Sequence, residues 1–174
     1  MPENRAYPPE GLTPPAPYTL AELRSAMESR AVVEGVAQRC DAVLNLSVQL
    51  GRISAIMPRE EATAPWISGA NREIAVLSRV GKPICCTVES IAADAKGAPL
   101  VTVSRRQAQE QAMDAMLESL RPGSVVAGRV VRMESFGAFV DIGRGIVALL
   151  PTEFISAARI RRPEQRFRTG QLKA

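Results

Sequence analysis

An internal repeat is the feature that most constrains what this chain can fold into. The repeat places Val32-Val33-Glu34-Gly35 beside Val125-Val126-Ala127-Gly128, 93 residues further along the chain. Without any insertion, the same offset pairs Arg39 with Arg132, Ala55 with Ala148, Pro58 with Pro151 and Glu60 with Glu153. Self-similarity at a fixed spacing is typical of a duplicated structural unit. The sequence therefore predicts two copies of one small module.

The first copy shows what kind of module is repeated. Strands are predicted near 31–39, 42–50, 52–57, 83–92 and 99–104, with a long irregular segment at 58–80. Five short strands with a longer connection after the third are typical of the OB barrel. We therefore expect an all-β protein with connecting helices, built from two five-stranded OB-fold barrels in tandem. The second copy would finish near residues 194–198, so its closing strands would be missing or only beginning. We thus expect the second barrel to be truncated at its C-terminal end and the chain to be part of a longer sequence.

Two helices and a proline-rich segment mark the boundaries between these parts. Thr19 with Glu22, and Ser104 with Gln107, are capping-box patterns, which start helices that end near Arg30 and Leu120. Six prolines within residues 1–18 fix φ and remove N–H donors, which predicts an extended or disordered arm. The expected organisation is this arm at 1–18, a first barrel with its N-terminal helix at 19–104, a linker helix at 105–121 and a second barrel at 122–174.

Positive charge is concentrated in the last third of the chain. The whole chain has a net charge of +4, but residues 121–174 alone hold ten basic and four acidic residues, a net charge of +6. Nine of those ten cations are arginines, whose planar guanidinium pairs with phosphate and stacks on bases. A solvated surface is the alternative explanation of the same pattern, and charge alone does not decide between the two.

Two of the four phenylalanines lie in one short stretch of the second copy. This stretch, Phe136-Gly137-Ala138-Phe139, opens the second predicted strand of that copy. Residues three apart in a regular strand face opposite sides, so the two rings share a face only if the backbone slips by one residue between them. Gly137 suits a β-bulge of that kind. We therefore expect both rings on an open face, as a platform on which unpaired bases stack.

The second copy resembles the S1 domain, an RNA-binding module named after the largest protein of the bacterial small ribosomal subunit. The resemblance rests on four spaced segments, at 122–131, 136–143, 145–153 and 167–171. The first copy resembles the same module more weakly. The resemblance implies that Phe136 and Phe139 lie on the nucleic-acid face, and that Pro151 stands where many members of the family carry a histidine.

These observations predict a site for single-stranded RNA on the second copy, with little sequence preference. Phe136 and Phe139 are the expected stacking residues. The expected phosphate contacts are arginines on or beside the first three strands and in the segment that follows them, namely Arg129, Arg132, Arg144, Arg159, Arg161 and Arg162. At the offset of 93, the first copy carries Val43 and Leu46 in place of the two rings. We therefore expect the first copy to bind RNA poorly and to serve as a spacer or a docking module.

Composition argues against catalysis by this chain. There is no histidine, so a Ser-His or Cys-His dyad cannot form, and three cysteines alone are too few for a zinc site. We expect a binding protein with no cofactor, no metal and no small-molecule substrate. No apolar run reaches the ~20 residues that span a bilayer, and the N-terminus lacks a signal-peptide pattern. A cytoplasmic protein with reduced thiols and no membrane partner is therefore expected.

The expected function is binding of single-stranded RNA, and of mRNA in particular, by a ribosomal-protein-like translation factor, with the small ribosomal subunit as a further candidate partner. The sequence leaves two alternatives open. One is an RNA-binding accessory module of a ribonuclease or RNA-processing complex whose catalysis lies in another chain. The other is a structural protein that docks on the ribosome.

Overall fold

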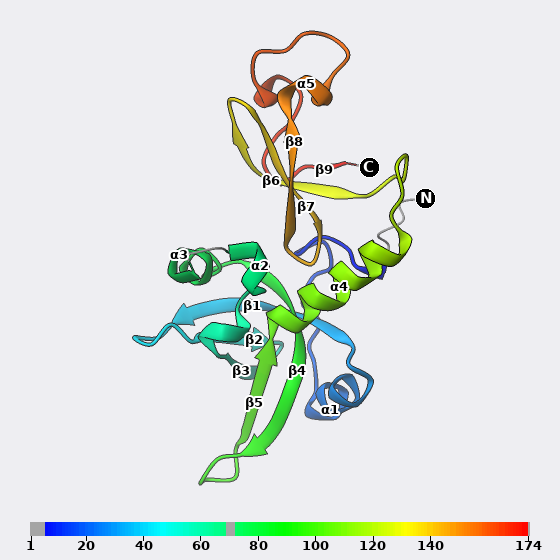
Figure 1. Cartoon of the computed structure of the whole chain (residues 1–174). Coiled ribbons are helices and arrows are strands. Elements are labelled where there is room, and N and C mark those ends of the chain that lie inside the picture. The colour runs from blue at the N-terminus through cyan, green and yellow to red at the C-terminus, as the bar shows by residue number, and fades with distance from the viewer. Residues whose placement is uncertain (1–5, 69–71, 174) are drawn as a thin grey trace. The chain divides into compact units, whose positions relative to one another are not determined.

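The computed structural model describes residues 6–68 and 72–173, which belong to two compact units (Figure 1). The first unit comprises residues 10–111, and the described part of the second unit comprises residues 6–9 and 112–173. Helix α4 (Arg105–Ser119) contains the boundary between them. Within the described residues, no helix combines the length and the apolar character that a membrane span needs.

The first unit is a closed barrel of five strands. These are β1 (Val32–Cys40), β2 (Leu46–Leu50), β3 (Ile53–Met57), β4 (Pro83–Ala93) and β5 (Pro99–Ser104). The strands pair in the order β1-β2-β3-β5-β4, and β1 closes the barrel by pairing with β4. Only β3 and β5 run parallel. Each strand expected in the first copy is therefore present, close to its expected position.

Alternating side chains fill the barrel. Leu46, Val48 and Leu50 of β2 are at most 1% exposed, whereas Ser47 and Gln49 between them are half-buried. This period of two follows from the pleat of a strand, which sends successive side chains to opposite faces. Burial of one such leucine or valine contributes about 1.5–3 kcal/mol. The register of β2 therefore decides which of its residues face the core.

Helix α1 (Leu20–Ser29) lies against β4 and buries Leu23 and Ala26. Its expected capping box is confirmed. The Oγ1 atom of Thr19 accepts a hydrogen bond from the Glu22 N–H at 3.3 Å, and Oε2 of Glu22 accepts one from the Thr19 N–H at 2.7 Å. The second expected start is confirmed as well, because Oγ of Ser104 accepts a hydrogen bond from the N–H of Gln107 at 3.0 Å.

The connection after β3, expected to be irregular, contains three short helical segments. They are η2 (Arg59–Glu61), α2 (Pro65–Ser68) and α3 (Arg72–Leu77), and residues 69–71 lie outside the described part. The buried side chain of Gln109 from α4 holds this connection, since its Oε1 accepts a hydrogen bond from the Ala64 N–H at 2.9 Å. Helices this short gain most of their stability from packing, so the sequence pattern alone does not reveal them.

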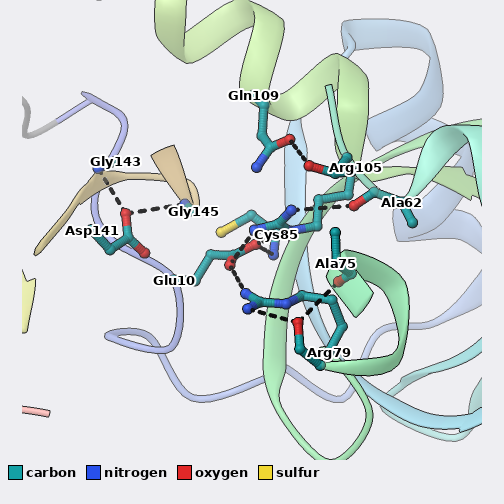
Figure 2. A network of polar contacts seen from close by, with 12 residues as sticks. Glu10, Ala62, Ala75, Arg79, Cys85, Arg105, Gln109, Asp141, Gly143 and Gly145 are labelled. Carbon is teal, nitrogen blue, oxygen red and sulfur yellow. Dashed lines mark hydrogen bonds and ion pairs between the residues drawn. The ribbon is translucent and has the colours of Figure 1, made fainter. Parts of the chain in front are cut away.

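The arm expected at residues 1–18 is buried at Tyr7, Pro9 and Glu10, whereas residues 12–17 are exposed. Glu10 is 5% exposed, and its carboxylate forms a two-pronged ion pair with Arg105, at 2.6 Å from Nε and 2.8 Å from Nη2 (Figure 2). Oε1 of Glu10 also accepts a hydrogen bond from the Cys85 N–H at 3.1 Å, and Nη1 of Arg79 lies 3.6 Å from Oε2 of Glu10. In the second unit, Tyr7 is 3% exposed. Residues 1–5 lie outside the described part.

This difference has a simple cause. Proline restricts helix and sheet pairing but not packing, and the partner of Glu10 lies 95 residues away in the chain. No local pattern can show such a contact.

The second unit contains a four-stranded sheet. Its strands β6 (Gly128–Glu134), β7 (Gly137–Gly143), β8 (Ile146–Pro151) and β9 (Leu172–Lys173) pair in the order β8-β7-β6-β9 (Figure 1). Two short helices, α5 (Thr152–Ile155) and η3 (Pro163–Gln165), lie in the connection between β8 and β9. The observed fold is thus mostly β, with one closed barrel and a second sheet.

The two units begin their fourth strands in the same way. In the first unit, the Gly81 N–H donates to the Ala37 carbonyl at 2.7 Å, and the Ala37 N–H donates to the Lys82 carbonyl at 3.1 Å. In the second unit, Gly170 and Val130 form the matching bond at 2.7 Å, and Val130 donates to Gln171 at 3.0 Å. Both glycines have a left-handed backbone, with φ of 79° and 83°, which favours glycine at this turn. The second unit therefore repeats the first as far as the start of the fourth strand.

Candidate nucleic-acid interface

Phe136 and Phe139 form a ring pair in the second unit. Their ring centroids lie 6.1 Å apart with an interplanar angle of 84°, an edge-to-face arrangement. Phe136 is 57% exposed and Phe139 is half-buried. An exposed aromatic surface of this kind can stack unpaired bases. The structure thus brings the two expected rings together, outside the core.

The rings meet for a reason that differs from the expected one. No register shift occurs at Gly137, which pairs regularly with Glu134 on one side and Pro151 on the other. Phe136 instead belongs to the two-residue turn Ser135–Phe136 that joins β6 to β7. A turn residue is not bound by the alternation of a strand, so its ring can reach the face on which Phe139 lies. The expected bulge at Gly137 is therefore wrong, although the expected proximity of the rings is observed.

Close packing around Gly137 holds the turn in place. A Cβ atom at this position would lie 2.6 Å from the Leu150 carbonyl oxygen and 2.9 Å from Cδ1 of Leu149. Thr152 adds two bonds: its N–H donates to the Phe136 carbonyl at 2.9 Å, and its Oγ1 donates to the Ser135 carbonyl at 3.2 Å. The turn that carries Phe136 is thereby tied to the beginning of α5.

Phe139 lies in a row of side chains that crosses three strands. Arg132 of β6 and Leu149 of β8 are its direct neighbours in the sheet. The Arg132 guanidinium carbon lies 4.5 Å from the Phe139 ring centroid, which is a cation–π contact. Nε of Arg132 also lies 3.5 Å from Oε1 of Glu134, an exposed ion pair of about 0–1 kcal/mol. Leu149, at 48% exposure, was not expected from the sequence, because its place opposite Phe139 depends on the strand register.

The chain between α5 and β9 contains an arginine-rich segment, residues 159–168. A surface pocket of about 630 Å³ extends from Phe136 to the start of this segment. Phe136 and Pro151 form part of its wall, and Arg159 forms another part. Thr152, Glu153 and Ser156 add polar groups. The structure therefore places Arg159 in the same pocket as Phe136. Pro151, which lies opposite Gly137 at the end of β8, contributes an apolar surface and no hydrogen-bond donor.

Arg161 and Arg162, further along this segment, are exposed. Arg161 and Arg162 line a second, smaller pocket with Glu164 and Gln165, and the Arg161 N–H donates to Oε1 of Gln165 at 2.8 Å. Within the described part of the chain, none of the side chains of Arg159, Arg161 and Arg162 forms an ion pair. Guanidinium groups without a carboxylate partner are available for phosphate.

Arg129 and Arg144 occupy different surroundings. Arg129 is half-buried in β6 and pairs with Asp141 in the sheet. Arg144 lies in the turn between β7 and β8, where its N–H donates to the Pro8 carbonyl at 2.9 Å and Nη2 donates to the Ala6 carbonyl at 3.1 Å. Phe136 and Arg144 stand at opposite ends of β7, roughly 25 Å apart at about 3.3 Å per residue. The structure does not bring Arg144 to the ring pair.

Strand register shows which residue of the first unit corresponds to Phe139. Phe139 pairs with Arg132 and Leu149. In the first unit, the residue that pairs with Arg39 and Ile56, the counterparts of Arg132 and Leu149, is Ser47. Leu46 corresponds instead to Ala138, and both of these are buried. The equivalence of Leu46 with Phe139, expected from the offset of 93, is therefore wrong.

Two compensating differences hide this shift in the sequence. The first unit has five residues between Cys40 and Leu46, whereas the second has four between the equivalent Met133 and Ala138. The second unit has one extra residue further along, in a bulge at Ile142, where the pairing of β7 with β8 shifts between Asp141 and Gly143. This extra residue compensates for the shorter connection. The copies therefore differ in register from 138 to 141, although their ungapped alignment is continuous on both sides.

Buried groups elsewhere do not form a reactive site. Cys85 and Cys86 are neighbours in β4 and both are buried, because Glu10 covers the outer side of the strand at Cys85. Burial raises the pKa of both thiols, that of Cys86 to about 12. Within the described residues, no group of three His, Cys, Asp or Glu side chains is placed to hold a metal ion.

Comparison with known proteins adds an independent observation about the ring-bearing segment. Residues 119–172 match the family model of the S1 RNA binding domain. The S1 match spans all of β6, β7 and β8, including both rings and the arginine-rich segment. It confirms the resemblance inferred from the sequence.

Curated relatives of this chain are called small ribosomal subunit protein bS1. The protein from Staphylococcus aureus strain COL is 36% identical over 75 residues, which cover 41% of this chain and 19% of the relative. The protein from Staphylococcus saprophyticus is 41% identical over 58 residues, covering 33% of this chain and 14% of the relative. The chain thus spans less than a fifth of the length of these relatives.

Proposed function

We propose that this chain binds single-stranded RNA on the outer face of β6, β7 and β8. The observation that carries the proposal is the edge-to-face pair of Phe136, which is exposed, and Phe139, which is half-buried, with Arg132 over the second ring. Bases stack on rings whatever their identity, because every base has a π face, so little sequence preference is expected. The S1 match over the same strands supports this assignment.

Stacking alone does not account for useful affinity. Two stacked bases contribute about 2–6 kcal/mol, whereas micromolar binding requires about 8 kcal/mol. The remainder must come from phosphate contacts. Arg132 lies beside the rings, Arg159 lines their pocket, and Arg161 and Arg162 are exposed further along the same segment. These four arginines are the phosphate contacts that we propose. Arg129 and Arg144 have weaker support, because one is half-buried and the other lies at the far end of β7.

We further infer that both units are OB-like modules, that the second carries the main site for RNA, and that the first, which lacks both rings, binds RNA poorly. The first unit has the strand order β1-β2-β3-β5-β4 of a closed five-stranded barrel. The second repeats its first three strands and the hydrogen bonds that begin the fourth. On this proposal the domain limits lie at 18/19, 104/105 and 121/122, and α4 connects the two modules.

The cellular role that we propose is binding of mRNA in translation, with the small ribosomal subunit as a candidate partner. The names of the relatives support this role, since they are small ribosomal subunit proteins. A binding role without catalysis fits a site of rings and guanidinium groups, which holds RNA by stacking and charge.

A direct binding measurement tests the proposed function. The full chain is titrated into a fluorescein-labelled 20-nucleotide single-stranded RNA of mixed sequence, and fluorescence anisotropy gives the Kd at 50 mM salt. We expect micromolar binding that weakens at least tenfold in a Phe136→Ala/Phe139→Ala double variant. Equal binding by the double variant, or no binding by the parent chain, would contradict the proposal. Sedimentation with ribosomes from cell extract, with and without ribonuclease, separates RNA tethering from direct docking.

A further inference from the structure

The first unit presents a face that matches the ring-bearing face of the second unit, with a serine in place of the stacking ring. We propose that this face of β1, β2 and β3 is a second surface for single-stranded RNA, and that it is weak chiefly because Ser47 stands in place of a ring. This proposal rests on the proposed function of the second unit and goes beyond it, because it assigns a site to the copy that lacks both rings.

The match is geometric. Ser47 pairs with Arg39 of β1 and Ile56 of β3, as Phe139 pairs with Arg132 and Leu149. Ile56 is 43% exposed and Leu149 is 48% exposed, so the apolar end of the row is open in both units. Arg39, like Arg132, is exposed. A bulge in the first strand also recurs at the same place, between Ala37 and Arg39 and between Val130 and Arg132.

The face has room for a ring. A surface pocket of about 360 Å³ is lined by Arg39, Cys40, Ser47 and Ile56, together with residues of the loop after β1. Ser47 is half-buried, and its Oγ lies 3.4 Å from Oγ of Ser54, an exposed contact. A larger side chain at position 47 therefore leaves no buried polar group without a partner, and it points away from the core that Leu46 fills.

The charges on the face weaken it further. Arg39 offers one cation for phosphate, but Asp41 follows close behind it and is held in place by hydrogen bonds from the N–H groups of Val43 and Asn45. A carboxylate near the phosphate path opposes binding. Stacking is insensitive to that charge. A base on a single ring increases affinity by about 5- to 150-fold.

The test transfers the ring between units in the full chain. Phe139→Ser gives the second unit the side chain of the first, and we expect it to weaken binding of the labelled 20-nucleotide RNA at least fivefold. Adding Ser47→Phe to that variant should restore binding at least fivefold. Adding Arg39→Gln as well should reduce the restored binding, because the new ring then lacks the guanidinium that accompanies Phe139 in the second unit.

Two matched controls separate stacking from bulk. Ser47→Leu adds apolar volume at the same position without a ring. Ser54→Phe adds a ring on the same face, outside the row of Arg39 and Ile56. Neither should restore binding in the Phe139→Ser background. Thermal unfolding checks that each variant is folded, and Ser47→Tyr replaces Ser47→Phe if the latter is not.

Each outcome has one meaning. Binding unaffected by Phe139→Ser would overturn the proposed function of the second unit and this inference with it. Loss in Phe139→Ser without recovery by a folded Ser47→Phe or Ser47→Tyr variant would overturn this inference alone. Recovery that Ser47→Leu matches would also overturn it, since the gain would then owe nothing to a ring.

Discussion

The Arg132 guanidinium lies 4.5 Å from the centroid of the Phe139 ring. At an exposed site, such a cation–π contact contributes about 0.5–1 kcal/mol, less than the ~1–3 kcal/mol of a stacked base. We therefore expect a bound base to displace the guanidinium from the ring and to leave Arg132 available for a phosphate contact.

Removing either ring should weaken RNA binding, whereas removing an exposed aromatic elsewhere should not. We expect Phe139→Ala and Phe136→Ala each to raise the Kd for single-stranded RNA by about 5- to 150-fold, because each removes one stacking surface. Trp66→Ala is the matched control, since Trp66 is an exposed aromatic of the first unit at 48% exposure. Fluorescence anisotropy measures all three. An effect of Trp66→Ala equal to that of the phenylalanine variants would contradict the assigned site.

Binding should depend strongly on salt. If about four phosphates are neutralised, the slope of log K against log salt should be near −3 on a single strand. Arg161→Gln/Arg162→Gln should reduce the slope to about −1.4, because two contacts are lost. Arg52→Gln in the exposed turn after β2 is the control and should leave the slope unchanged. A parent slope near zero would remove the phosphate contacts from the proposal.

Glu10 should be essential for the stability of the first unit. Glu10→Gln leaves the buried Arg105 without its counter-charge, so we expect the free energy of unfolding to fall by about 3–5 kcal/mol. The single tryptophan, Trp66, belongs to the first unit, and its fluorescence in a urea titration reports the unfolding of that unit. Glu28→Gln, at an exposed position of α1, should have almost no effect. A loss below 1 kcal/mol in Glu10→Gln would show that the ion pair is dispensable.

Stability of the first unit should fall at acidic pH. Burial by itself raises the pKa of Glu10, but the charges of Arg105 and Arg79 and the hydrogen bonds it accepts outweigh burial, so its pKa lies below the ordinary value of 4.5. Its ionised form is therefore favoured by folding. This stability is fully present above about pH 4.5 and is lost as pH falls through the lowered pKa of the folded state.

Glu61 acts in the same direction. Burial opposes its ionisation, but hydrogen bonds from Arg106 and Ser104 lower its pKa. Urea titrations followed by Trp66 fluorescence between pH 3 and pH 7 measure the effect. A Glu10→Gln variant should show a flatter profile below pH 4.5, and an unchanged profile would contradict the assignment.

The folded chain should expose no more than one reactive thiol. Cys85 and Cys86 are buried, and burial raises the pKa of both, whereas Cys40 is half-buried. With an aromatic disulfide reagent at pH 8, we expect about one equivalent of slow reaction before unfolding and three after it. Cys40→Ser should abolish the reaction of the folded chain. Rapid modification of all three thiols in native buffer would show that Glu10 does not cover the strand.

Local patterns predicted the larger part of the fold. Short strands separated by turns, and the capping pairs Thr19 with Glu22 and Ser104 with Gln107, depend on neighbours in the sequence, and the structure contains them. The ring pair and Arg159 could also be anticipated, because the turn, the strand and the following segment lie close along the chain.

The remaining features depend on distant partners. Glu10 forms its ion pair with Arg105 and covers Cys85, and both of these residues lie far from it in the chain. No helix or strand periodicity in the sequence indicates such contacts. The place of Leu149 beside Phe139 requires the register of two strands.

The sequence by itself determined that the chain contains an internal repeat at an offset of 93 residues, short strands, and two rings among arginines in the later copy, since these features can be read from residue identities and spacing. Only the tertiary structure decided that Ser47, rather than Leu46, stands where Phe139 stands. Compared with the first unit, the second has one residue fewer between β6 and β7 and one residue more in the bulge of β7, so the two changes cancel in an ungapped alignment. Hydrogen bonding between the strands shows each change separately. Because a shift of one residue exchanges the two faces of a strand, that pairing determines which side chain meets solvent.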